Sequence, residues 1–535
     1  LDTVTEVSGF AIGGKTSLKQ RVELIKSGDG GETYKISVFS ADARAGDREL
    51  VAITSNFDSN TKRLSGEFSL SAEHREISPY LKTLGFPLPD LSVAGSGRYE
   101  FTERTGDGSI VAALKIRVSN LEAVQSELAV AGELDVIANI DASLAGSAVA
   151  INKLEISVKD SSGNTPLRAR NLQPFTVDHR ASDLGLSEVE GDLLEVAFER
   201  LPFAWIGSYI PGSAVRGDTV SGALSLARGR GGVRIKSVKP LKVSEFSLNT
   251  SDVAQLENLE LSLNPDVFYN GTRIRLEVGV AARDSGERVI FNGKFETDST
   301  PGELRAGRFP MKGTSVIELI RMMDQPFAAS IPRLPASKLS LRAEFEGALE
   351  NGQIHVSRFS SNVVDGQLAK VLNLDLKQRF SVVAFAPYVN FSQDSGVLLD
   401  AELKEFPINL IAPFIPGLSV SGDRATGGVS IEKTSAGSYR MSALKPLVVE
   451  GLTVGRGDEI FVRDVTFSGS PTITLTPARV DIVWEDLELR SGRRRAMAGR
   501  GGLSIGRDGP SLQILQANGR VTADLPAIFA QPVFA

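Results

Sequence analysis

The chain contains no cysteine in its 535 residues, and this absence removes several kinds of chemistry. Disulfides, thiol nucleophiles and cysteine-ligated metals are excluded. A protein without thiols suits an oxidising compartment such as a bacterial periplasm. Histidine is scarce as well: His74, His179 and His355 are scattered, and none lies at metal-ligand spacing from another. We therefore expect no catalytic residues, no metal and no cofactor, and hence no enzyme.

Strong net charge and long apolar runs are also lacking. The net charge is −6 and no long basic stripe occurs, so we expect no nucleic-acid partner. The uncharged stretch 406–422 contains Pro407, Pro413 and Pro416, and is too short and broken to span a bilayer. The chain opens "LDTVTEVSGF", without an initiator Met or a secretion signal. We expect a processed N-terminus or a start partway along a longer chain, with any membrane anchor before Leu1.

What the sequence does contain is a repeat. The stretch "LPFAWIGSYIPGSAVRGDTVSGALSL" (201–226) aligns without a gap with "FPINLIAPFIPGLSVSGDRATGGVSI" (406–431), at an offset of 205 residues. The similarity continues into "VRIKSVKPLKV" and "YRMSALKPLVV" after one inserted residue. No change in composition marks a linker. We therefore predict one elongated repeat architecture over residues 1–535, with units near 1–122, 123–250, 251–360, 361–455 and 456–535.

Period-two alternation dominates the rest of the chain. In "KLSLRAEFEG" (338–347), apolar residues alternate with Lys, Ser, Arg and Glu, and "LKIRV" (114–118) and "RIRLEVGV" (273–280) behave in the same way. Turn sequences such as "SGDGGE" and "RTGDGS" separate these runs. This pattern is typical of antiparallel strands with one apolar and one polar face. The predicted fold is mainly β, a long curled antiparallel sheet forming a groove.

A few short amphipathic helices are expected between the strands. Apolar residues recur at three-to-four spacing in five segments, each too short to be stable alone in water. These segments are residues 76–86, 201–210, 314–327, 406–415 and 524–530. Their apolar side chains can plug the edge of the groove as core or line a lipid entry. The residues concerned are Trp205, Ile206, Tyr209, Ile210, Ile411, Phe414 and Ile415.

A sheet with one apolar face must cover it with a second layer, close on itself or curl into a trough. A continuous apolar trough can hold acyl chains, since a tail of ~16 carbons gains about 13 kcal/mol on leaving water. Near-uniform apolarity lets a lipid slide between equivalent positions. The candidate groove residues are Leu64, Phe68, Leu70, Leu114, Ile116, Val118, Ile274, Leu276, Val278, Leu339, Leu341, Phe345, Ile473, Leu475, Ile482 and Trp484.

At these residues the sequence resembles the AsmA-like superfamily of bacterial envelope proteins, which includes TamB-, YhdP- and YdbH-type members. The resemblance rests on the repeated "P…I…Y/F-I-P-G…V…G-D…G" units, on "SGRYEF" and "SGALSL" strands after short helices, and on the C-terminal segment from "VDIVWEDLELRSGRRR" onward. It implies a periplasmic β-groove that carries phospholipid between the inner and outer membranes. It also implies inner-membrane anchoring by a helix that these residues lack, with membrane surfaces or membrane proteins as partners.

Alternatives stay open at this point. Arg493, Arg494, Arg495 and Arg500 lie in "SGRRRAMAGRGG", either as a solubilising hairpin tip or as a contact for anionic headgroups. For the whole chain, a lipid conduit competes with a structural envelope scaffold, which would have a dry packed interior. It also competes with an outer-membrane assembly factor of the TamB kind.

Overall fold

The structure is a computed structural model that describes most of the chain. The described residues are 2–5, 16–26, 34–45, 48–58, 61–76, 78, 89–124, 126–178, 185–186, 189–207, 214–229, 231–250, 253–329, 333–334, 338–350, 353–383, 389–391, 395–410, 412–414, 419–434, 438–476, 478–508 and 511–532.

The described chain is mainly β, with antiparallel pairing and only short helices, which confirms the predicted fold class. Contacts divide it into two compact units. Unit 1 comprises Leu1–Phe246 and Leu261–Leu276, and unit 2 comprises Ser247–Glu260 and Glu277–Ala535. The division passes through three strands, β15 (Gly232–Thr250), β16 (Val253–Tyr269) and β17 (Ile274–Arg283).

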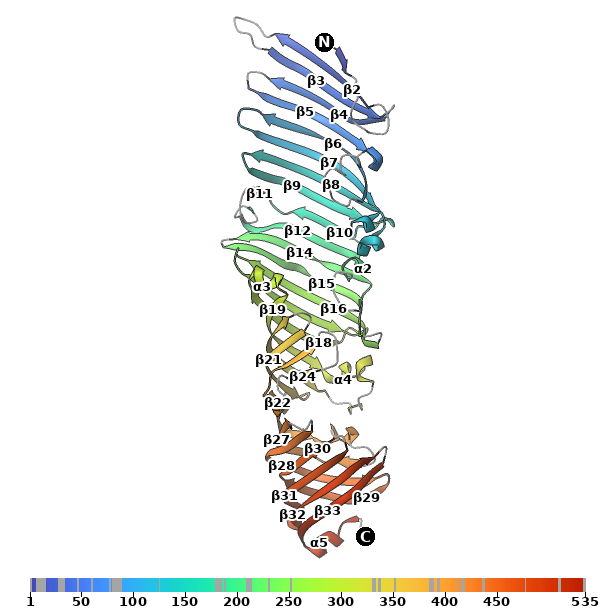
Figure 1. The fold of residues 1–535 in the computed structure, drawn as a ribbon, viewed down its shortest axis with the longest axis vertical. Helices are drawn as coiled ribbons and strands as arrows, with labels where there is room; N and C mark the ends of the chain where they lie inside the picture. The colour runs from blue at the N-terminus through green and yellow to red at the C-terminus, as the bar shows by residue number, and fades with distance from the viewer. Residues whose placement is uncertain are drawn as a thin grey trace. The chain divides into compact units, whose positions relative to one another are not determined.

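Unit 1 is built from hairpins in chain order (Figure 1). Its other strands are β1 (Asp2–Thr5), β2 (Thr16–Lys26), β3 (Tyr34–Ala45), β4 (Arg48–Asp58), β5 (Arg63–Ala72), β6 (Asp90–Thr102), β7 (Asp107–Ser119), β8 (Leu134–Ala145), β9 (Ala148–Lys159), β10 (Leu167–Asn171), β11 (Phe175–Asp178), β12 (Val189–Pro202), β13 (Ala214–Arg216) and β14 (Thr219–Gly229). Its short helices include η1 (Leu121–Ala123), η2 (Ser126–Ala131) and α2 (Ala204–Gly207), and residues 74–76 and 78 are helical as well.

Each strand of unit 1 pairs with its neighbours in sequence from β1 to β9. Beyond β9 the pairing runs through β10 to β12, β14 and β15, and β11 also pairs with β9. The β6–β7 hairpin pairs without interruption from Asp90 and Ser119 to Thr102 and Asp107. Its turn closes at Gly106, whose φ of 73° suits a residue without a side chain.

Unit 2 repeats this plan. Its strands are β18 (Val289–Ser299), β19 (Arg308–Glu318), β20 (Ser340–Glu350), β21 (Gln353–Val364), β22 (Lys370–Leu376), β23 (Phe380–Val383), β24 (Val389–Phe391), β25 (Gly396–Pro407), β26 (Ser419–Ser421), β27 (Arg424–Lys433), β28 (Tyr439–Arg456), β29 (Glu459–Gly469), β30 (Pro471–Leu475), β31 (Arg479–Ser491), β32 (Arg494–Asp508) and β33 (Ser511–Ala523). Its helices are α3 (Pro301–Arg305), α4 (Leu319–Met322), η3 (Pro326–Ala328), η4 (Ile408–Leu410), η5 (Ala412–Phe414) and α5 (Leu525–Phe529).

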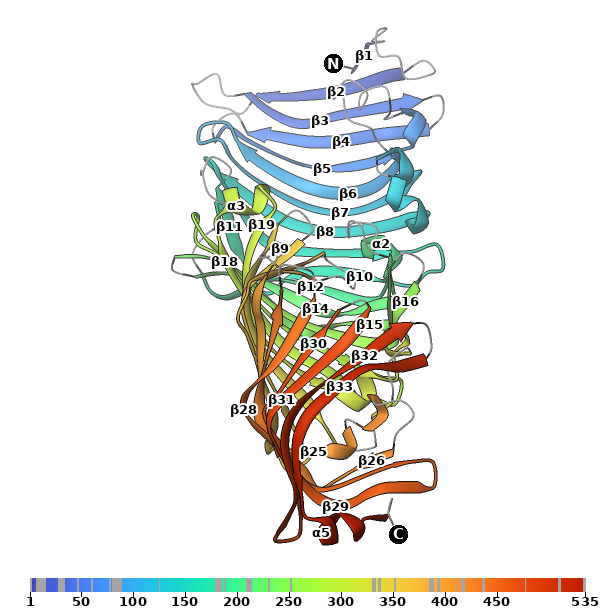
Figure 2. The same ribbon diagram turned by 60° about the horizontal axis from the view of Figure 1, so that its bottom comes forward.

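Pairing in unit 2 again follows the chain. The order runs β18, β19, β20, β21, β22, β25, β27 and β28, and then through β29 and β30 to β31, β32 and β33. Within this unit, β28, β31, β32 and β33 bend along their length (Figure 2). Register shifts interrupt several of these pairings, as β-bulges do in bent strands.

The predicted helices are shorter in the structure. Segment 201–210 begins as the end of β12, and among its described residues, 201–207, the helix is α2. Segment 314–327 begins as β19 before α4. Segment 406–415 ends β25 and continues as two 3-10 turns, while segment 524–530 forms α5 as predicted. In segment 76–86 only Glu76 and Ser78 fall within the described residues, and both are helical. Sheet pairing on both sides of β19 explains why its apolar spacing did not produce a longer helix.

The repeat seen in the sequence is a repeated bulge in the structure. Gly222 in β14 and Gly427 in β27 have φ angles of 153° and 145°, and each lies where the pairing to the next strand shifts register. A Cβ at Gly222 would lie 2.6 Å from the Pro240 carbonyl oxygen, and one at Gly427 would lie 2.8 Å from that of Pro446. The two copies therefore share a backbone conformation that only glycine fits without strain.

We expect Gly222→Ala and Gly427→Ala each to lower the free energy of unfolding by about 1–3 kcal/mol, because both add strain and a backbone clash. Urea unfolding followed by circular dichroism measures the loss. Gly229→Ala is the matched control in β14, because a Cβ added there would meet no atom within 4 Å. Equal unfolding midpoints for the three variants would contradict the strained-bulge interpretation.

Candidate functional site

The candidate site is the apolar face of the sheet. In unit 1, one row of directly paired positions crosses nine strands from β4 to β14. Its members are Val51, Leu70, Gly95, Leu114, Ala138, Ile156, Ala169, Val196 and Leu224. The neighbouring row is Ala72, Val93, Ile116, Val136, Val158, Leu167, Phe198 and Gly222. No charged side chain interrupts either row.

Unit 2 carries equivalent rows. One runs from β22 to β33 through Leu376, Leu399, Ile431, Met441, Ile473, Ile482, Leu503 and Ala517. Another runs from β18 to β25 through Phe291, Ile317, Leu341, Val363, Leu372 and Leu403. Because side chains alternate along a strand, every row of this kind lies on one face of its sheet.

Aromatic rings pack over glycines on this face. Phe295, Gly313 and Phe345 are directly paired, and a Cβ on Gly313 would lie 2.9 Å from each ring. The ring centroids of Phe295 and Phe345 are 5.9 Å apart. Trp484 stands over Gly501 in the same way, 3.3 Å from the position of a Cβ. Glycine at these positions leaves room for the ring, so the face stays apolar where the chain has no side chain of its own.

Among the described residues, few cover the apolar face. In the row from Val51 to Leu224 only Ala138 is buried, and the other members are partly exposed to solvent. The accessible surface of the chain is 31594 Å². A single compact protein of this mass exposes about 19,000 Å², and two compact halves would together expose about 23,000 Å². The apolar rows therefore form an accessible surface, whereas a closed two-layer core would bury them.

Most of the predicted groove residues lie on this surface. Leu64, Phe68, Leu70, Leu114, Ile116 and Val118 are half-buried on one face of β5 and β7, and the charged residues between them point away. Leu339 differs, because it is buried in a cluster with Val363, Val371 and Leu410. The other members are half-buried, except Leu475, which is exposed: Ile274, Leu276, Val278, Leu341, Phe345, Ile473, Ile482 and Trp484.

The short helices cover one end of the apolar rows. Trp205 in α2 packs against a buried cluster of Leu201, Phe203, Val220 and Val243. Ile206, one residue on, is 38% exposed. Of these two helical residues, Trp205 therefore packs against the core and Ile206 faces solvent. The predicted edge residues Tyr209, Ile210, Ile411 and Ile415 lie outside the described residues, as does the side chain of Phe414.

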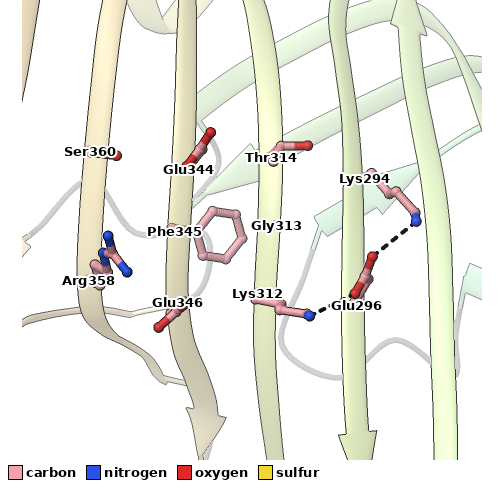
Figure 3. A pocket seen from close by; sticks show the side chains of 10 residues that line it. All are labelled: Lys294, Glu296, Lys312, Gly313, Thr314, Glu344, Phe345, Glu346, Arg358 and Ser360. Carbon is pink, nitrogen blue, oxygen red and sulfur yellow. Dashed lines mark ion pairs between the residues drawn. The ribbon is translucent and has the colours of Figure 1, made fainter.

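The opposite face is a field of paired charges. Lys294 lies 2.9 Å from Glu277 and 3.0 Å from Glu296, and Lys312 lies 3.1 Å from Glu296. The ion pairs of Glu296 lower the pKa of its carboxyl. Figure 3 shows Lys294, Glu296 and Lys312 beside a hollow of about 300 Å³ that Arg358 and Glu346 also line. Such pairs on an exposed surface contribute little to stability, and the charges they carry make this face unsuited to acyl chains.

A second hollow on the polar face, of about 680 Å³, lies in unit 1 and is lined by Arg168, Arg170, Glu195, Glu199 and Lys239 among others. Both hollows carry charges of both signs. The described residues include no group of three or more His, Asp or Glu side chains placed to hold a metal ion. None of the described helices has the length and apolarity needed to cross a bilayer.

The arginines of "SGRRRAMAGRGG" separate in the structure. Arg493, Arg494 and Arg495 are exposed at the β31–β32 turn, where Arg495 lies 3.0 Å from Glu488. Arg500 lies within β32, directly opposite Arg520 of β33. The spacing of the arginines in the sequence places Arg500 with the turn and gives no sign that Arg520 faces it. The alternation of "NGRVTA" could have placed Arg520 on the polar face.

Comparisons with known proteins give no further guide to the site. No protein-family model matches the chain. No curated protein matches it either. The resemblance to the AsmA-like superfamily therefore stays a prediction that rests on the sequence patterns alone.

On the polar face, the carboxylate of Glu402 has several partners. It accepts hydrogen bonds from Lys445 at 2.6 Å and from Asn373 at 3.2 Å, and it forms an ion pair with Lys404. Lys445, followed by Lys404 and Asn373, lowers the pKa of Glu402 to about 2. Because the folded pKa lies below the ordinary value of 4.5, ionised Glu402 favours the fold above that value, and this contribution is lost as the pH falls through about 2.

We expect Lys445→Met to move the pKa of Glu402 upward toward 4.5. Carbon-13 NMR titration of glutamate carboxyls, with Glu402→Gln to assign the signal, measures the shift. Arg440→Met is the control, because Arg440 lies 3.8 Å from Glu432 and is not among the causes that lower the pKa of Glu402. An unchanged pKa in Lys445→Met would refute the role of Lys445.

Proposed function

We propose that this protein is a non-enzymatic lipid conduit, which shields acyl chains on the apolar face of its sheet. The observation that carries the proposal is the set of apolar rows that cross strand after strand while remaining partly exposed. Exposed apolar patches of this extent in a soluble protein mark interaction sites. An acyl chain suits such rows better than a compact ligand, because the rows are long, uniform and free of polar anchors.

The energetics favour a mobile ligand. Each methylene group that leaves water contributes about 0.8 kcal/mol, and successive positions along a row offer nearly the same contact. A lipid can therefore move along the face without a deep energy minimum that would trap it. The charged face opposite keeps the protein in water, and the headgroup can stay hydrated at the margin of the sheet.

The proposed setting is the bacterial envelope, with phospholipid or another acyl-chain lipid as cargo and with inner- and outer-membrane surfaces or proteins as partners. The absence of cysteine and the resemblance to the AsmA-like superfamily support this setting. The structural-scaffold alternative requires a dry, packed interior. The half-exposed rows from Val51 to Leu224 favour the conduit over that alternative.

We expect a photo-crosslinking amino acid at Leu114 to capture phospholipid in the purified protein, while the same residue at Lys115 captures none. The two positions are neighbours in β7 on opposite faces, so both variants test one strand. Mass spectrometry of the crosslinked protein and of an organic extract measures the result. Protein that is consistently free of lipid, or equal capture from both faces, would refute the proposal.

Two triple variants test whether lipid occupies the apolar rows. The first variant places three charges in one apolar row, through Leu70→Asp, Leu114→Asp and Ile156→Asp. We expect this variant to co-purify with severalfold less lipid. Ser69→Asp, Lys115→Asp and Ser157→Asp place the same charges on the opposite face of the same strands. Circular dichroism establishes that both triple variants are folded before their lipid content is compared.

A further inference from the structure

The structure contains a repeat of about 206 residues that extends well beyond the motif visible in the sequence. Asn258 and Asp464, 206 residues apart, have φ angles of 54° and 50°. The backbone N–H of the residue before each of them donates to a glutamine side chain: Glu257 to Gln325 at 2.9 Å, and Arg463 to Gln531 at 2.8 Å. These glutamines are also 206 residues apart. The two copies therefore share their hydrogen bonds as well as their strands.

Strand register shows the same equivalence near the end of each copy. In the first copy, Gly293 pairs with Ser315 and Glu296 with Lys312 across β18 and β19. In the second, Gly499 pairs with Val521 and Gly502 with Asn518 across β32 and β33. Each residue of the second set lies 206 residues after its counterpart in the first set. The helix α4, which begins at Leu319, likewise corresponds to α5, which begins at Leu525.

The two copies differ in the strand that comes next. β19 pairs with β20 along its whole length, from Arg308 and Glu350 to Glu318 and Ser340. β33, the counterpart of β19, pairs with β32 alone among the described strands (Figure 2). Apolar side chains of β33 are correspondingly exposed: Leu515 by 57% and Val521 by 54%. A long edge strand with exposed apolar side chains and no proline is a template for another strand.

The charges near the edge of β33 indicate which side chains a strand paired with β33 would carry. In the first copy Lys294 has two carboxylate partners, Glu277 and Glu296. The counterparts of these three residues in the second copy are Arg500, Val483 and Gly502. Arg500 instead faces Arg520, and within the described part of the chain neither arginine has a carboxylate within ion-pairing distance. Like charges placed directly opposite one another are unfavourable.

Other groups face the same surface. Arg500 and Arg520 line a hollow of about 690 Å³ together with Asp481, Glu485 and Asn518. Asp481 is already engaged, since it lies 2.9 Å from Arg479 and accepts a hydrogen bond from Ser504 at 2.6 Å. In the first copy, the positions equivalent to Asn518 and Arg520 face Glu346 and Glu344 of β20. A strand with the polar pattern of β20 would bring a carboxylate to Arg520.

We propose that the edge of β33 binds an extended strand of a partner protein that alternates apolar and acidic residues, in the register that β20 adopts on β19. Backbone hydrogen bonds supply the pairing, and the acidic side chains meet the two arginines. An aromatic residue of the partner would stand over Gly519, because Phe345 stands over the equivalent Gly313. The proposal is independent of lipid binding.

The probe is a labelled peptide with the sequence of residues 338–350, KLSLRAEFEGALE. We expect saturable binding to the full chain by fluorescence anisotropy, and no binding of a scrambled peptide. Glu344→Lys in the peptide should weaken binding about three- to tenfold, as expected for an attractive charge pair made repulsive. Arg520→Glu in the protein should restore binding of that altered peptide and weaken binding of the original one.

Arg494→Glu is the matched control, because Arg494 is exposed at the β31–β32 turn and does not pair with β33. Its affinity for both peptides should be unchanged. Arg520→Glu relieves the contact between like charges, so it should not unfold the sheet, and circular dichroism tests this. Failure of the peptide to bind, or equal affinities across the charge swap, would overturn the proposal.

Discussion

Strand register is the constraint on which the rest of this structure depends. Because successive side chains point to opposite faces, a shift of one residue in any pairing would bring Lys115 into the row that Leu114 occupies. The register shifts in the structure occur at defined bulges, and the apolar rows continue across them. Gly222 and Gly427 hold the same bulge in both copies of the repeat. Separation of apolar and charged side chains thus follows from backbone pairing, without a large buried core.

This separation explains how one sheet can combine two surfaces of opposite character. Charges such as Lys312 of β19 and Glu296 of β18 form pairs across neighbouring strands, so opposite charges offset one another on the polar face. The apolar face has no comparable internal partner in the described part of the chain, apart from the helices that pack near Leu201 and Leu339. Its free energy falls when apolar groups cover it, and this is the physical basis for the proposal that it binds lipid. On the same face, Arg500 and Arg520 lie directly opposite one another as two like charges.

The alternation in "KLSLRAEFEG" and "LKIRV" was sufficient to predict an antiparallel, mainly β fold and the side of the strand on which Leu114 and Phe345 lie. It was not sufficient to place Leu339, which is buried because helical residue Leu410, far along the chain, packs against it. Helix lengths were overestimated for a related reason, since pairing of β19 on both sides outweighs three-to-four spacing within one segment. The opposition of Arg500 and Arg520 depends on register between strands, which spacing along one strand does not contain.

Pairing between neighbours in sequence has a consequence for how such a chain is made. Nearly every strand finds its first partner within one turn, as β6 and β7 do, so few contacts have to wait for distant parts of the polypeptide. Low contact order favours rapid folding, and in repeat architectures structure can propagate from one element to the next. A chain that emerges gradually, from a ribosome or a secretion channel, can therefore add one hairpin at a time to a sheet that is already folded. Growth of the sheet then keeps pace with delivery of the chain.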